Sequence, residues 1–173
     1  DGALRNISGN NVWSGNITLA GTTRFNSDND SLAIAGSITN STNALTVGGA
    51  ASISISGVLG SGNGTLTKDG VGPLTLTGTN TYSGATAVNA GTLSVTGSIS
   101  SPVTVNLGGT QGGTGTISNT VTVNSGGTLA PGTSPGIINT GNLTLTAGST
   151  LTVEIDGTTV GTQYDQTNAT GTV

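Results

Sequence analysis

The sequence predicts an all-β fold, a right-handed parallel β-helix (a β-solenoid) of roughly eight coils of about 20 residues each. Three observations support this prediction. Aliphatic residues alternate with Thr, Ser or Ala along most of the chain, which is the period of a strand with one buried face. Clusters of Gly, Asn and Ser separate these runs and are typical of tight turns. Equivalent runs also recur at a nearly constant spacing, which indicates stacked repeats.

The alternating runs define the expected strands. No stretch shows the spacing of an amphipathic helix, so the prediction contains strands and turns only. The clearest strands are expected at residues 32–34, 45–47, 53–55, 74–76, 93–95, 103–105, 121–123, 143–145 and 151–155.

Two interleaved series set the coil length. One series runs along Leu32, Ile53, Leu74 and Leu93, and the other along Leu45, Leu66 and Val88. Successive members of both series are separated by nearly the same number of positions, which is the signature of a repeat architecture. At ~4.8 Å per coil the rod is about 40 Å long, and parallel crossovers favour a right-handed winding. The alternative is an antiparallel β-sandwich, which calls for more aromatic core residues and a less regular spacing.

The composition excludes most other classes of protein. Gly, Thr, Ser and Asn supply 101 of the 173 residues, only 6% are charged, and Cys, Met and His are absent. An enzyme is not expected, because the side chains that act as nucleophiles and proton carriers are nearly missing. Three basic residues and a net charge of −4 argue against nucleic acid as a partner, and no apolar run is long enough to insert into a membrane.

One segment carries a family resemblance. Residues 72–95 read GPLTLTGTNTYSGATAVNAGTLSV and closely resemble the autotransporter-associated β-strand repeat. Residues 2–15, 56–60, 66–70 and 126–136 are similar to the same class of bacterial surface protein. The resemblance implies a right-handed parallel β-helix in an exported passenger region, at the cell surface or secreted, and implies no particular ligand. We expect residues 1–173 to form one β-helix segment of a longer extracellular chain.

Glu154 and Asp156 are the first place to look for catalysis, because they lie two residues apart on an expected strand and so share a face. A paired-carboxylate mechanism needs a fixed separation and a raised pKa on one carboxyl group, and an exposed pair supplies neither. The pair is interpreted as solvated surface charge, and no catalytic residue is predicted.

Asp28 and Asp30 lie in the densest cluster of oxygen ligands, residues 26–31, and are the candidates for a Ca²⁺ site. The calcium-loop pattern, with its central Gly and terminal Glu, is absent. A polar turn is therefore favoured, and neither a metal nor another cofactor is predicted.

Trp13 is the candidate contact for a sugar, because exposed aromatic rings often form sugar platforms, although burial against the first coil is favoured. Tyr82 belongs to the repeat and is expected to pack inside. Asn89, Asn106, Asn119 and Asn124 are either members of an amide ladder or separate turn residues. The Thr-x-Thr pairs at 65/67, 75/77, 120/122, 144/146 and 150/152 suggest an ice-binding array, but an incomplete one.

The functional prediction is a non-catalytic stalk or adhesin-type segment of a bacterial surface or secreted protein, with a host surface, matrix or glycans as partners of the parent chain. The alternative is a fibre subunit that stacks end to end, because neither end carries an evident charged or Pro-rich cap, and open β-helix ends are templates for pairing. A polysaccharide-active β-helix enzyme and an ice-binding solenoid rank below these.

Overall fold

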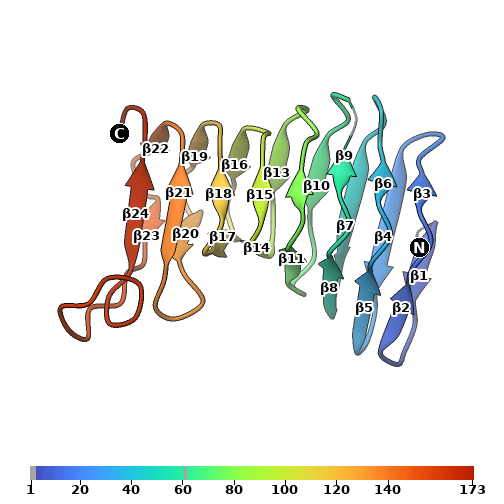
Figure 1. Ribbon diagram of the computed structural model, residues 1–173, viewed down its shortest axis with the longest axis horizontal. Helices are drawn as coiled ribbons and strands as arrows, with labels where there is room; N and C mark the ends of the chain where they lie inside the picture. The colour runs from blue at the N-terminus through green and yellow to red at the C-terminus, as the bar shows by residue number, and fades with distance from the viewer. Residues whose placement is uncertain (1–2, 61) are drawn as a thin grey trace.

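The computed structural model describes residues 3–60 and 62–173. Within these residues there are 24 short strands and no helix, and every strand-to-strand ladder is parallel. The chain winds through eight coils that lie side by side along the long axis (Figure 1). Each coil contributes one strand to each of three faces. The predicted β-solenoid of roughly eight coils is thus confirmed, and its right-handed winding stays a prediction.

The first face is a sheet of eight strands, one from each coil. Its strands, in the order in which they pair, are β1 (Leu4–Asn6), β4 (Thr23–Ser27), β7 (Leu45–Gly49), β10 (Leu66–Lys68), β13 (Thr86–Val88), β16 (Val103–Val105), β19 (Val121–Val123) and β22 (Leu143–Leu145).

The second face is a sheet of the same size and order. Its strands are β2 (Asn11–Trp13), β5 (Ser31–Ile34), β8 (Ser52–Ile55), β11 (Leu74–Leu76), β14 (Gly91–Val95), β17 (Gly109–Gly113), β20 (Thr128–Pro131) and β23 (Thr150–Leu151).

The third face is divided into two sheets. The first contains β3 (Ile17–Thr18), β6 (Ile38–Thr39) and β9 (Leu59–Gly60). The second contains β12 (Thr79–Asn80), β15 (Ser98–Ile99), β18 (Thr116–Ile117), β21 (Ile137–Thr140) and β24 (Gln166–Ala169). The division falls between coils 3 and 4, where the other two faces are continuous.

Aliphatic columns run along the axis and form one core. On the second face Ile53, Leu74 and Leu93 stack in register, as the first sequence series predicts. Their side chains are almost completely buried. Because each strand contributes only a few inward side chains, and several contribute one, burial of these columns depends on the neighbouring coils rather than on any one coil.

The second sequence series is correct at its first step and wrong at its second. Leu45 pairs with Leu66, but Leu66 then pairs with Thr86, and Val88 pairs with Lys68. The prediction placed aliphatic residues on aliphatic residues, whereas the structure places a buried threonine and a buried lysine in the columns.

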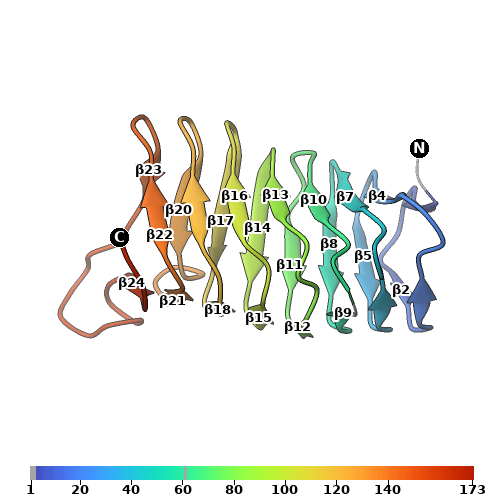
Figure 2. The same ribbon diagram turned by 90° about the horizontal axis from the view of Figure 1, so that it is seen from above.

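The coils are not all of one length. Ile53 pairs with a residue 21 positions further on, and Thr86 with one only 17 positions further on. Ile137 pairs with a residue 29 positions further on, because coil 8 contains a long loop at residues 152–165. This loop extends past the last coil at the C-terminal end of the rod (Figures 1 and 2).

The loop also corrects the last predicted strand. A strand was expected at residues 151–155, but β23 ends at Leu151, and Ile155 makes only an isolated bridge to Tyr164. Val153 and Ile155 were expected to point inward, yet 43% and 75% of their surfaces are exposed. The alternating pattern here therefore does not produce a strand.

Candidate functional site

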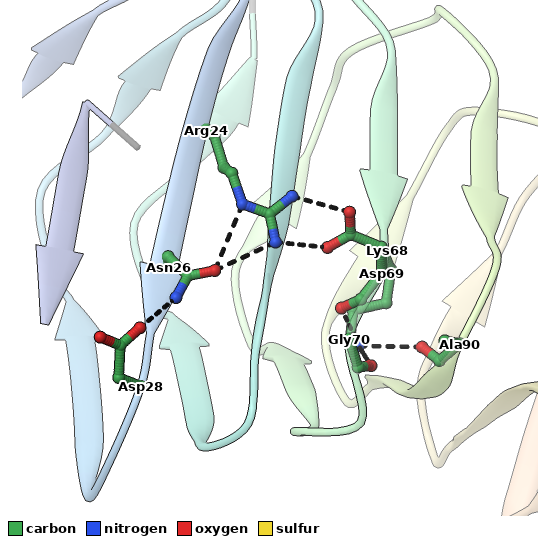
Figure 3. A network of polar contacts seen from close by, with 7 residues as sticks. All are labelled: Arg24, Asn26, Asp28, Lys68, Asp69, Gly70 and Ala90. Atoms are coloured by element: carbon green, nitrogen blue, oxygen red, sulfur yellow. Dashed lines mark hydrogen bonds and ion pairs between the residues drawn. The ribbon is translucent and has the colours of Figure 1, made fainter. Parts of the chain in front are cut away.

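All three basic residues of the chain, Arg5, Arg24 and Lys68, lie on the first face, in coils 1, 2 and 4. Figure 3 shows Arg24 and Lys68. Arg24 donates from Nη1 to Asp69 Oδ2 at 2.7 Å and from Nη2 to Asp69 Oδ1 at 2.9 Å, a two-pronged ion pair. The hydrogen bond to Asp69 raises the pKa of Arg24. The pair joins coil 2 to coil 4 and passes over coil 3.

Gly48 makes this long contact possible. It lies in coil 3, paired with Asn26 of β4, and a Cβ atom there would meet Asp69 Oδ1 at 1.9 Å. Any side chain at this position would occupy the space through which Asp69 reaches Arg24. The contact joins residues 45 positions apart, and no local sequence pattern predicts it.

The predicted metal candidates are engaged in other contacts. Asp28 accepts from Arg5 Nε at 2.8 Å and from Asn26 Nδ2 at 2.5 Å, and the Arg5 hydrogen bond lowers the pKa of Asp28. Asp30 is exposed and accepts from the backbone N–H of Gly9 at 2.7 Å. In the described parts of the chain no three His, Cys, Asp or Glu side chains gather as a metal-binding group. The residues thus serve as links between coils 1 and 2.

Lys68 is a buried residue that the sequence analysis missed. Only 1% of its surface is exposed, and Nζ donates to the backbone oxygens of Asp69, Gly70 and Ala90 at 2.7, 2.7 and 2.9 Å. Burial lowers the pKa of Lys68 to about 8, with an opposing effect from Asp69. Because Ala90 belongs to the next coil, the ammonium group connects coils 4 and 5 (Figure 3).

Asn80 makes a second buried connection on the third face. Its Oδ1 accepts from the N–H of Leu59 in coil 3 at 2.9 Å. Its Nδ2 donates to the oxygens of Gly78 and Ser98, at 3.0 and 3.1 Å. One amide group therefore contacts coils 3, 4 and 5, and its polar atoms are satisfied despite burial.

Tyr82 is fully buried, as the sequence predicts. Its hydroxyl shares a hydrogen bond of 2.7 Å with Thr86 Oγ1, which shares one of 2.5 Å with Ser101 Oγ. Burial raises the pKa of Tyr82. The three hydroxyl groups join coil 4 to coil 5 and to the connection that leads into coil 6.

Replacing Tyr82 by Phe removes the hydroxyl but keeps the packed ring. We expect the free energy of unfolding to fall by about 1 kcal/mol, because Thr86 loses one of its two partners. Urea titration measures this change. The matched control is Tyr164→Phe at a half-buried ring, which should change the free energy by less than about 0.5 kcal/mol. Equal losses in the two variants would contradict the assigned role of Tyr82.

Trp13 lies at an inward position, in register with Ile34, yet 47% of its surface is exposed. No described coil precedes it, so its ring forms part of the wall of an apolar hollow of about 260 Å³ at the N-terminal end of the rod. The hollow is otherwise lined by Ala3, Leu4, Ile17, Thr18, Leu19, Thr23 and Phe25. Trp13 therefore packs at the end of the core and does not lie on an outer face.

The acidic residues of coil 8 pair differently from the prediction. Ser134 Oγ donates one bifurcated hydrogen bond to the Glu154 carboxylate, with Oε1 at 2.7 Å and Oε2 at 2.9 Å. Glu154 and Asp165 both line a second hollow, beside residues 130–134, and Asp165 accepts from the N–H groups of Gly136 and Glu154 at 2.7 and 2.9 Å. Asp156 lies outside this hollow. The expected carboxylate pair on one strand is thus wrong, because β23 ends before Glu154.

Polar ladders cover the outside of the rod. Asn106 donates to Asn89 and Asn124 donates to Asn106, each at 2.8 Å, whereas Asn119 donates to the oxygen of Ser100 instead. Three of the four residues thus form an amide ladder, but it lies at the surface and not inside the rod, as an internal ladder would require. One threonine of every Thr-x-Thr pair lies outside a strand, so the described strands form no two-column array of the kind that ice binding needs.

The comparisons with known proteins agree with this geometry. Residues 66–95 match the family model of the passenger-associated-transport-repeat. No curated protein matches the chain. The described residues contain no helix of the length and hydropathy needed to cross a membrane. The matched segment spans coil 4 and the first two strands of coil 5, and it contains Lys68, Asn80 and Tyr82. Residues 66–95 are therefore an autotransporter passenger repeat set within a longer β-solenoid.

Proposed function

We propose that this chain is a non-catalytic stalk segment of a bacterial passenger region that holds adhesive parts of the parent protein away from the cell. The passenger repeat and the solenoid fold support a secreted or cell-surface, non-enzymatic domain. One observation carries the finer proposal. The buried polar groups of the repeat bond to the scaffold, as in Lys68 and Asn80, and do not point into a cavity.

The proposed mechanism is mechanical. Hydrogen bonds between backbone groups of successive coils run along the axis on all three faces. Buried side chains of the repeat add bonds between coils 3, 4, 5 and 6. Outward Thr, Ser and Asn keep the surface hydrated with few charges. The hydrogen bonds between coils and the buried core hold the rod together without a disulfide. Binding to host surfaces, matrix or glycans is assigned to regions that the rod presents.

End-to-end assembly into fibres is the second candidate, and the N-terminal end favours it. There the strand edges of coil 1 surround the apolar hollow beside Trp13. The C-terminal end argues against it, because the loop at residues 152–165 extends past the last coil and carries Glu154, Asp156 and Asp165 (Figure 2). The expectation that neither end has a charged cap is wrong at this end. Charged, irregular segments over strand edges hinder edge-to-edge pairing.

Negative-stain electron microscopy across a concentration series separates the two candidates. A stalk segment stays as discrete short particles at all concentrations, and sedimentation velocity gives one monomeric species. The triple variant Glu154→Gln, Asp156→Asn, Asp165→Asn removes the loop charges and tests whether they keep the rods apart. Filaments of the unmodified chain, one rod wide, would contradict the stalk proposal and support assembly as the function.

A further inference from the structure

The boundary between coils 3 and 4 differs from the other boundaries among the described coils. The first and second faces cross it with regular ladders, β7 to β10 and β8 to β11. On the third face the ladder stops at β9 and a new sheet begins at β12. We call this boundary the seam.

Hydrogen bonds of the described residues on the third face of the seam are of mixed kind. Backbone bonds run from Thr81 N–H to the oxygen of Leu59 and from Ser83 N–H to the oxygen of Gly62, at 3.0 and 2.9 Å. The N–H of Leu59 finds the side chain of Asn80 as its acceptor, in place of a backbone oxygen. In a solenoid, the total stability is approximately the sum of the intrinsic stability of each coil and the stabilising contacts between neighbouring coils. The seam is accordingly the one boundary among the described coils at which a face lacks a continuous strand ladder.

The ion pair of Arg24 and Asp69 crosses this same boundary on the first face. Its side chains are 31% and 35% exposed, and it joins coil 2 directly to coil 4. The other ion pair, between Arg5 and Asp28, joins coil 1 to coil 2 and does not cross the seam. Among the described residues, one Arg–Asp pair on the first face thus spans the seam and another, Arg5–Asp28, does not.

We propose that the seam divides the rod into two cooperative units, coils 1–3 and coils 4–8, and that the Arg24–Asp69 pair is the contact that couples them. Local opening follows cooperative units of this kind, and each unit exchanges its amide hydrogens as a block. With the pair intact, coils 1–3 share the stability of the longer unit. With the pair broken, they open on their own, while coils 4–8 stay closed. This proposal does not depend on which adhesive regions the rod carries.

Hydrogen exchange followed by mass spectrometry on the whole chain tests the proposal. The variants are Arg24→Gln and Asp69→Asn, and the matched control is Arg5→Gln. Both test variants should speed exchange across residues 3–60 by about three- to tenfold, as expected for a half-exposed two-pronged pair, with little change across residues 84–145. Asp69 contacts coil 2 at Arg24 and lies against coil 3 at Gly48, so an effect that extends into coil 1 reports coupling and not local damage. The control should affect coils 1 and 2 alone.

Two further measurements complete the test. The double variant Arg24→Gln, Asp69→Asn should exchange like either single variant, because one contact has been removed in all three. Salt screens both exposed Arg–Asp pairs, so coil 3, which the Arg5–Asp28 pair does not contact, is the segment to compare. For the unmodified chain, 1 M NaCl should speed exchange in coil 3 as Arg24→Gln does, and it should add nothing in coil 3 of that variant. Faster exchange confined to coils 4 and 5 in Asp69→Asn, or equal acceleration over all coils in Arg24→Gln, would overturn the proposal.

Discussion

Replacing Gly72 by Ala is expected to lower the free energy of unfolding by more than about 4 kcal/mol, or to prevent folding. Gly72 lies in the passenger repeat, in the corner that leads into β11, and is buried. A Cβ atom there would meet the backbone oxygen of Ala51 in the preceding coil at 2.1 Å and its carbonyl carbon at 2.6 Å. Backbone cannot move away without breaking the bond from Gly72 N–H to the oxygen of Gly49, at 3.0 Å.

Urea titration followed by circular dichroism measures the loss. The matched control is Gly21→Ala, at a glycine whose added Cβ meets nothing within 4 Å. That variant should be neutral or slightly more stable, because alanine restricts the unfolded chain more than glycine does. If Gly72→Ala and Gly21→Ala unfold at the same urea concentration, the close stacking of coils 3 and 4 at this corner is wrong.

The second large effect is expected for Lys68→Met, which keeps the apolar stem and removes the ammonium group. The oxygens of Asp69, Gly70 and Ala90 then lose their shared donor. We expect the free energy of unfolding to fall by about 1–3 kcal/mol at pH 7. Leaving the buried backbone oxygens without a donor costs more than is gained by no longer burying the ammonium charge. Urea titration checks it, and Thr67→Val, on the outer side of the same strand, is the control with an expected change below about 0.5 kcal/mol.

The pH dependence of stability tests Lys68 in a second way. Its pKa in the folded chain is about 8, below the ordinary 10.5, so between these values the unfolded chain binds more protons than the folded one. The free energy of unfolding therefore rises with pH above 8, by about 1–2 kcal/mol up to pH 9.5. Ionisation of tyrosine opposes this rise near pH 10. Lys68→Met should show no such rise, and an equal rise in both proteins would show that another group causes it.

The sequence predicts the regular parts of the fold because one physical rule produces them. Most positions in a buried column are occupied by an aliphatic residue. The steps through Leu32, Ile53 and Leu74 can therefore be predicted from their spacing alone. The same rule fails at Lys68, because a lysine is ordinarily exposed and only the surrounding carbonyl oxygens of two coils make its burial favourable. Leu66 and Val88 were consequently aligned two residues out of register.

The contacts between distant coils were beyond sequence reasoning. The Arg24–Asp69 pair requires a side chain from coil 2, a carboxylate from coil 4 and the small Gly48 between them. Asn80 resembles any turn asparagine in the sequence, although it completes the seam with its amide. Composition did show that few charged side chains are present. In the structure, these side chains serve mainly as links between coils. The match at residues 66–95 agrees with the resemblance found in the same segment.

Distances between spin labels test the stacked-coil account most directly, and the absence of cysteine makes labelling at chosen sites simple. Thr46, Thr122 and Thr144 lie on one outward column of the first face, through Thr67, Ala87 and Thr104. Thr122 is four rungs from Thr46, and Thr144 is five.

Double electron–electron resonance on the cysteine pairs at 46/122 and 46/144 should therefore give about 19 and 24 Å, at ~4.8 Å per rung. The whole segment between Thr122 and Thr144 adds only that one rung, because these two residues are paired directly. Two distances that differ by one rung would support the solenoid. Distances that do not grow from the first pair to the second, or that exceed about 35 Å, would contradict it.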